Sequence, residues 1–187
     1  MPAMPDVTTQ GVPAALWRFA SESCGIPSAA LRLRPGTELP EPARGLLVHD
    51  RDMTSTLAAF HGSALRVDLL QQRQFEETYF REVFLRTIAD GRIVEYGIIA
   101  IDLEQFTPPQ QDAIRAGKAP LGALLHHFQI PFESSPIGFF SLATASLAEA
   151  RRAALPGAQG HGRFNRLAKP TGESLASIME ILPGLPG

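Results

Sequence analysis

Residues 79–85 read Tyr-Phe-Arg-Glu-Val-Phe-Leu, and this run says most about how the chain folds. Its residues alternate with the period of two that is typical of a β-strand, which places Arg81 on a face that a sheet would bury. Residues 176–182 repeat the pattern, with Glu180 flanked on its own face by apolar side chains. An unpaired charge in such surroundings costs several kcal/mol, so each of the two residues needs a partner. That partner is either the other residue or a bound ligand.

The two alternatives lead to different classes of protein. In the first, Arg81 and Glu180 form a buried ion pair that holds two strands together. In the second, they line a cavity in which Arg81 binds a substrate carboxylate through a fork of hydrogen bonds. Glu180 then contacts the other end of the ligand. The alternation alone does not choose between them.

Other alternating runs and helical patterns define the fold class. Asp90-Gly91 separates residues 79–85 from an alternating run at 93–101, and Asp-Gly between two such runs is a strong hairpin signal. Further strands are predicted at 65–70 and 175–182, and helices at 54–60, 107–116, 121–128 and 142–154. Their order favours one α+β domain around a mainly antiparallel sheet, and short connections argue against a parallel one.

Several helix ends carry recognisable signals. Thr107 with Gln110 forms a capping-box pattern around two prolines, and Gly62 is placed to end the helix at 54–60, for which Thr54 or Ser55 is the expected cap. Asp50 and Asp52 precede that same helix. Carboxylates favour a helix N-terminus, so a capping role is expected for them rather than acid–base chemistry.

The chain divides into an arm and a domain. Residues 1–44 contain seven prolines and are expected to form an irregular arm with one short helix near residues 13–23. Residues 45–187 form the folded domain. At 187 residues in total, the chain is the size of one ordinary domain.

Composition excludes several functions. Hydrophobic residues make up 44% of the chain and the net charge is −2, so neither nucleic acid nor an anionic membrane is an expected partner. Cys24 is the only cysteine, which fits a reducing compartment and predicts a cytoplasmic protein. The spacing of the five histidines fits no metal site, and we expect neither a metal nor an organic cofactor.

Five segments in order resemble the chorismate lyase family, whose members split chorismate into 4-hydroxybenzoate and pyruvate. The resemblance covers roughly residues 46–183. One segment, residues 79–85, resembles the family's Tyr-x-x-Arg-Glu-x-x-Leu strand with one residue fewer between Tyr and Arg. Residues 46–54 resemble the family's opening run, which ends in Met-Thr, and residues 118–122 resemble its Pro-Leu-Gly turn. Residues 162–167 resemble its Gly-Arg-x-x-Arg-Leu segment, and residues 179–183 resemble its terminal Glu-x-x-x-Pro strand, shortened here by one residue.

The resemblance implies a fold, an activity and a site. The fold would be an antiparallel sheet of about six strands with helical flaps over a buried pocket. The activity would be a carbon–oxygen lyase reaction without a cofactor, with a small aromatic or cyclohexadiene carboxylic acid as ligand and a monomer or weak dimer as the working state. Arg81 and Glu180 would be catalytic, and the ligand-binding set would be Met53, Arg81, Leu121 and Glu180.

One departure from the family favours an alternative. The return strand of the family usually carries an arginine in the pocket region, and the matching position here is Ile98, with Glu95 and Tyr96 nearby. Loss of a cation weakens binding of a dianion such as chorismate. The alternative is a non-lyase enzyme on the same fold that acts on another aromatic or polyketide-like acid in specialised metabolism. A third reading, a ligand-sensing module, is disfavoured by the lack of a helix-turn-helix pattern in residues 1–44.

A buried pocket also needs a lid. The expected lid segments are residues 107–128 and 139–162, the second including the predicted helix at 142–154. If lid opening limits release, an aromatic product should dissociate slowly.

Overall fold

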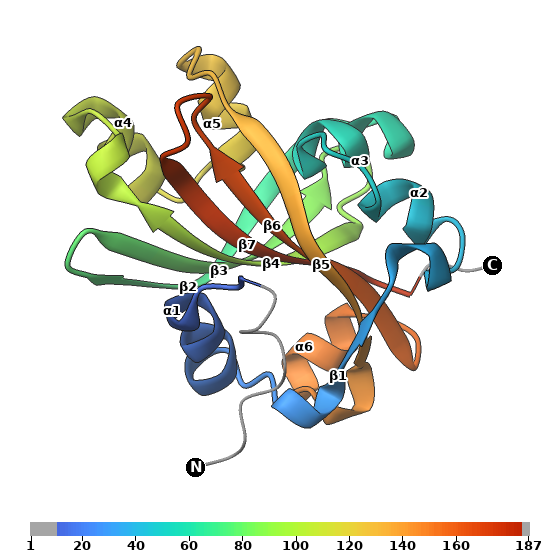
Figure 1. The fold of residues 1–187 in the computed structure, drawn as a ribbon. Helices are drawn as coiled ribbons and strands as arrows, with labels where there is room; N and C mark the ends of the chain where they lie inside the picture. The colour runs from blue at the N-terminus through green and yellow to red at the C-terminus, as the bar shows by residue number, and fades with distance from the viewer. Residues whose placement is uncertain (1–10, 185–187) are drawn as a thin grey trace.

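The computed structural model describes residues 11–184, which form one seven-stranded antiparallel sheet flanked by helices. The strand order is β1-β5-β6-β7-β4-β3-β2 (Figure 1). The strands are β1 Leu31–Arg34, β2 Leu65–Phe75, β3 Thr78–Thr87, β4 Ile93–Asp102, β5 Glu133–Ala143, β6 Gln159–Ala168 and β7 Ser174–Leu182. The α+β class predicted from the sequence is confirmed, and the architecture is that of the chorismate lyase-like fold.

Helices cover both faces of the sheet (Figure 1). Four of them pack on the face that carries Arg81, which we call the pocket face: α2 Ala43–Leu47, α3 Met53–His61, α4 Pro108–Arg115 and α5 Leu121–His127. The opposite face is covered by α1 Ala14–Arg18, the π-helical turn that continues it, and α6 Glu149–Ala154 with its flanking residues. Each layer buries its own hydrophobic cluster, so the sheet is the central layer of three.

The central strands are buried on both faces. Residues of β3 alternate between the two clusters, with Val83 and Leu85 on the pocket face and Phe80 and Phe84 on the opposite one. The register aligns Val83 with Gly97, Gly97 with Glu180, and Glu180 with Arg163 across four neighbouring strands. This row brings charged residues from distant parts of the sequence onto one buried surface.

Several local predictions are confirmed. The hairpin at Asp90-Gly91 joins β3 to β4, and Gly91 adopts a positive φ of 72° that favours glycine. A capping box of Thr107 and Gln110 begins α4, with the Gln110 side chain accepting from the Thr107 amide at 2.9 Å. Gly62 ends α3 in the left-handed conformation. The cap of α3 is Asp52, whose side chain accepts from the Ser55 amide at 2.8 Å, and not Thr54 or Ser55.

Other expectations were wrong or incomplete. The predicted helix at 142–154 is helical only at Thr144–Ser146, a short 3-10 turn, and at Glu149–Ala154, which is α6, because residues 133–143 are strand β5. Strands β1, β5 and β6 were not predicted. The sequence of β5 contains Pro136 and Gly138, where the pairing with β6 is irregular, so its alternation is broken. Of the arm, residues 11–44 add β1 to the sheet edge and Leu16 to the core; residues 1–10 lie outside the described part.

Candidate functional site

Arg81 is buried on the pocket face without a charged partner. Its side chain leaves the middle of β3, and the residue is 1% exposed. Nη1 donates a long hydrogen bond of 3.3 Å to the carbonyl of Ala119, while Nε and Nη2 have no hydrogen-bond partner in the structure. Burial lowers the pKa of Arg81 to about 10, so the guanidinium is still charged at neutral pH. A buried cation with free donors is a strong indication of an anion site.

A second buried arginine shows how the same fold satisfies such a group. Arg163 on β6 is 0% exposed, and its Nε donates to the Glu180 carboxylate. Its other nitrogens donate to the carbonyls of Leu47, His49 and Arg51 at 2.9–3.1 Å. Arg163 thereby ties the connection between α2 and α3 to the sheet. Every side-chain nitrogen of Arg163 donates a hydrogen bond, whereas two nitrogens of Arg81 donate none.

Glu180 therefore pairs with Arg163 and not with Arg81. The structural alternative of an Arg81–Glu180 ion pair is not realised, and among residues 11–184 no carboxylate forms an ion pair with Arg81. Glu180 still lines the same pocket as Arg81. Burial raises the pKa of the Glu180 carboxyl, and the Arg163 guanidinium partly opposes that rise. Arg163 lies in the segment 162–167 and could not be assigned a role from the sequence, because its pairing with Glu180 depends on the register of β6 against β7.

Glu95 is a further buried carboxyl at this site. It lies on β4, is 4% exposed, and its Oε2 has no hydrogen-bond partner. Burial, reinforced by the nearby Glu180 charge, raises the pKa of Glu95 well above its ordinary value. Since Glu180 has the Arg163 guanidinium and Glu95 has no donor, we place the shared proton on Glu95. From the sequence, Glu95 is expected only to lie near the pocket region, with no assigned role.

Ile98 does not belong to the pocket. It is 0% exposed in the hydrophobic cluster of the opposite face, with Tyr96 and Phe84. The pocket-facing residues of β4 are Glu95 and Ile99. The position that was matched to the family's arginine therefore lies outside the pocket, because neighbouring residues of a strand point to opposite faces.

Two helix N-termini close the pocket over the sheet. Met53 and Thr54 begin α3, and Pro120 and Leu121 begin α5; all four line the pocket. A Cβ on Gly122 would lie 3.1 Å from both Asp52 Oδ1 and Thr54 Oγ1, so the two helix ends are in close contact. The sheet supplies an apolar floor of Val83, Leu85, Ile99, Leu167 and Ile178. All four sequence-predicted binding residues thus line one pocket: Met53, Arg81, Leu121 and Glu180.

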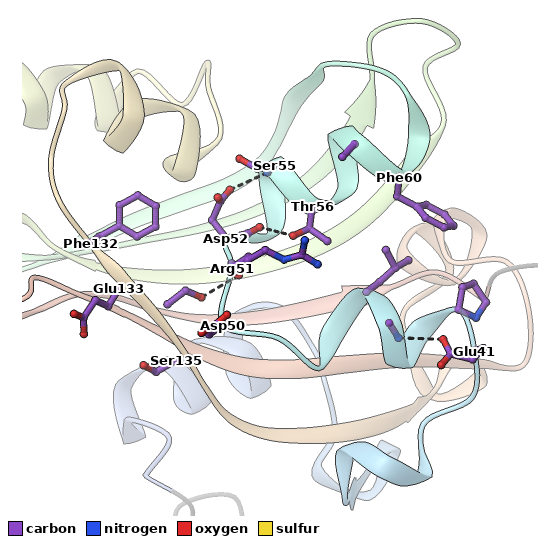
Figure 2. A pocket seen from close by; sticks show the side chains of 15 residues that line it. Glu41, Asp50, Arg51, Asp52, Ser55, Thr56, Phe60, Phe132, Glu133 and Ser135 are labelled. Atoms are coloured by element: carbon purple, nitrogen blue, oxygen red, sulfur yellow. Dashed lines mark hydrogen bonds between the residues drawn. The ribbon is translucent and has the colours of Figure 1, made fainter.

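The pocket is small, and a larger open groove lies beside it. The pocket volume is about 30 Å³, enough for a single water molecule. The groove measures about 1050 Å³ and runs between α2–α3 and the start of β5; Figure 2 shows Asp52 and Ser55 on one side of it and Phe132 and Glu133 on the other. Asp52 lines both spaces. A ligand that reaches Arg81 therefore has to part α3 from α5, and the groove offers a route to that contact.

The second expected lid segment lies elsewhere. Residues 107–128 contain α4 and α5 and cover the pocket, whereas α6 packs on the opposite face. There Arg151 of α6 binds the buried Glu82 carboxylate at 2.5 and 2.8 Å, and Tyr96 and Gln71 donate to the same group at 2.5 and 2.6 Å. The expectation that the helix after residue 142 forms a flap over the site was wrong.

Within residues 11–184, no group of three or more His, Cys, Asp or Glu side chains is arranged to hold a metal ion. None of the helices in this part of the chain is long and apolar enough to cross a membrane.

Comparison with known proteins gives matches among solved structures only. No family model and no curated protein matches the sequence. Among solved structures, PhnF from Mycobacterium smegmatis matches with a TM-score of 0.53 at 16% identity, covering 73% of this chain and 65% of PhnF. The effector domain of PhnF alone matches with a TM-score of 0.51 at 15% identity, covering 71% of this chain and 88% of that domain. The chain thus spans about two thirds of the length of PhnF.

At these identities the likeness establishes the fold alone. The chain has a chorismate lyase-like fold that it shares with the effector domain of PhnF.

Proposed function

We propose that this chain is a small-molecule binding domain whose ligand is an organic monoanion, held in the buried pocket by Arg81. The observation that carries the proposal is the free Nε and Nη2 of a guanidinium that is 1% exposed. A carboxylate fits two parallel N–H donors of arginine in a fork and removes the unsatisfied charge. The apolar floor then favours a flat, apolar ligand body.

The role of such a domain is ligand sensing rather than turnover. Two considerations favour this over the lyase reading. Among the described residues that line the pocket, Arg81 is the only cation, while chorismate carries two carboxylates. Likeness to the effector domain of PhnF adds fold-level support. A cytoplasmic location is a prediction from the lone cysteine, which is buried.

A direct test uses isothermal titration calorimetry with benzoate. Wild-type protein is expected to bind benzoate, and Arg81→Met to lose at least about tenfold in affinity, because a charged hydrogen bond pair is removed. Arg73→Met removes an exposed arginine from the neighbouring strand β2 and serves as the matched control. Equal affinity in wild type and Arg81→Met would overturn the proposal.

The lyase reaction is the second candidate, supported by the position of Glu180 beside the same pocket. In that mechanism Arg81 holds the ring carboxylate of chorismate, and backbone amides near Met53 and Leu121 complete the clamp. Glu180, already oriented by Arg163, faces the ring hydroxyl and assists loss of the ring proton as the enolpyruvyl group departs as pyruvate. Incubation with chorismate separates the two functions: 4-hydroxybenzoate and pyruvate appear only if the lyase reading holds. Absence of both, with turnover of another aromatic or polyketide-like acid, would instead indicate a non-lyase enzyme on this fold.

A further inference from the structure

The small pocket on the Arg81 face contains unsatisfied polar groups at two places. One is the guanidinium of Arg81, and the other is Oε2 of Glu95. Both side chains line the same small space, and both residues are at least nine-tenths buried. A buried polar atom without a partner is rare in folded proteins and demands a reason. A ligand that satisfies only Arg81 would leave Oε2 of Glu95 without a hydrogen-bond partner.

The register of β3 and β4 fixes how far apart these groups begin. Arg81 is aligned with Ile99, and Glu95 lies four residues earlier on β4. Strand geometry then separates their Cα atoms by about 14 Å. Both side chains reach into the pocket, and a Cβ on Gly97 would lie 3.1 Å from Glu95 Oε1, so the Glu95 carboxyl extends over Gly97 toward the Arg81 row. The two unsatisfied groups thus belong to residues that are well separated along the strands, an arrangement that suits a ligand with polar groups at opposite ends.

The charges around Glu95 determine whether its carboxyl is ionised or neutral. The groups that face it are Glu180, a like charge, and Arg163, which is committed to Glu180 and to backbone carbonyls. An ionised Glu95 would place two adjacent carboxylates around one guanidinium in a dry interior. A neutral Glu95 leaves the Arg163–Glu180 pair balanced and presents an O–H donor.

We infer that Glu95 is a specificity-determining residue: its neutral carboxyl donates a hydrogen bond to an uncharged acceptor at the far end of the ligand. The pocket then selects a monoanion with an opposite hydroxyl or carbonyl over a dicarboxylate. A second carboxylate would meet Glu95 and Glu180 instead of a cation. This inference rests on the proposed function, since Arg81 must hold the anionic end.

The experiment measures the affinity of four probes by calorimetry near pH 7: benzoate, 4-hydroxybenzoate, terephthalate and 4-(aminomethyl)benzoate. For wild type, 4-hydroxybenzoate is expected to bind about tenfold more tightly than benzoate, the effect of one satisfied buried hydrogen bond. Terephthalate and the zwitterionic aminomethyl compound are expected to bind more weakly than 4-hydroxybenzoate. The strongest binding by the aminomethyl compound would overturn the inference, since it would show an ionised Glu95 that binds a cation.

Two substitutions at one position identify the group responsible. Glu95→Gln retains a neutral donor of the same shape and should keep the preference for 4-hydroxybenzoate over benzoate. Glu95→Leu removes the donor and should make the two affinities equal. A preference that survives in Glu95→Leu would overturn the inference while leaving the Arg81 site intact. If no probe binds wild type, or if Arg81→Met binds them all unchanged, the proposed function itself is wrong.

Discussion

Arg81 is expected to reduce stability while it enables binding. Its free donors and charge are buried without compensation, and replacing such a group by an apolar side chain of similar length removes that penalty. Arg81→Met should therefore raise the free energy of unfolding by about 1–3 kcal/mol, equivalent to a Tm increase of about 2–10 °C. Thermal unfolding of the ligand-free protein measures this change. A marked loss of stability in Arg81→Met would show that the guanidinium is satisfied by the protein alone.

The raised pKa of Glu95 predicts how the free energy of unfolding depends on pH. Its pKa is raised in the folded protein, because of burial and the nearby Glu180, above the ordinary value of 4.5. Below that value folded and unfolded chains both hold the proton. Between the two pKa values only the folded chain holds it, so the free energy of unfolding falls as the pH rises. Glu95→Gln cannot titrate and should be more stable than wild type near pH 8 by at least about 1 kcal/mol, with a smaller gain near pH 5.

Denaturant unfolding at both pH values tests the titration of Glu95. The matched control is Glu77→Gln, an exposed glutamate in the turn between β2 and β3. It should show no comparable dependence on pH. A gain in Glu95→Gln that is equal at both pH values would contradict a protonated Glu95.

At the residue level, the sequence identified which charges matter but not their partners. Alternation alone placed Arg81 and Glu180 on buried strand faces, and both lie there. The partner of Glu180 could not be predicted, because Arg163 meets it only through the β6–β7 register. The same limit applies to Ile98, because the face of β4 on which it lies depends on the pairing of that strand with β3 and β7.

At the scale of elements, the contact between α3 and α5 is expected to control ligand release. Gly122→Ala would add a methyl group 3.1 Å from Asp52 and Thr54, tighter than ordinary van der Waals contact, and should hold the two helices apart. The dissociation rate of 4-hydroxybenzoate should rise by about three- to tenfold. Stopped-flow displacement by excess benzoate measures this rate.

Ala123→Ser, on the exposed side of α5, is the control for Gly122→Ala and should leave release unchanged. Trp17 is a poor reporter for this motion, because it is buried on the opposite face of the sheet. An unchanged rate in Gly122→Ala, with a folded protein, would place the exit elsewhere.

Elements with strong local signals were predictable, and those defined by pairing were not. The Asp90-Gly91 turn and the Thr107 capping box each satisfy backbone groups within a few residues, so the sequence reveals them. Strand β5 shows no clean alternation around Pro136, and its identity comes from pairing with β1 and β6. The helix predicted across 142–154 merged a strand end with α6 because alanine-rich sequence continues through both.

For the whole molecule, the two faces of the sheet are expected to have separate roles. Glu82 is 0% exposed and depends on Arg151, Tyr96 and Gln71. These hydrogen bonds outweigh burial and lower the pKa of Glu82, so the stability they contribute is present above the ordinary value of 4.5 and is lost as the pH falls. Arg151→Met should lower the free energy of unfolding by about 1–3 kcal/mol near pH 7 and by less near pH 4.

The Arg151→Met variant also tests whether the opposite face is purely structural. Its affinity for 4-hydroxybenzoate should equal that of wild type, because Arg151 does not line the pocket. Arg152→Met, the exposed neighbour on α6, should change neither stability nor affinity. Loss of affinity in Arg151→Met at full folding would show that the two faces are coupled through β3.

The central claim is that Arg81 binds the carboxylate of a ligand, and a crystal structure of the protein with 4-hydroxybenzoate tests this most directly. We expect the carboxylate oxygens about 3 Å from Nε and Nη2 of Arg81, the hydroxyl facing Glu95, and α5 moved away from α3 to admit the ring. Density for the ligand only in the open groove beside Phe132, with the Arg81 donors still unbonded, would contradict the central claim.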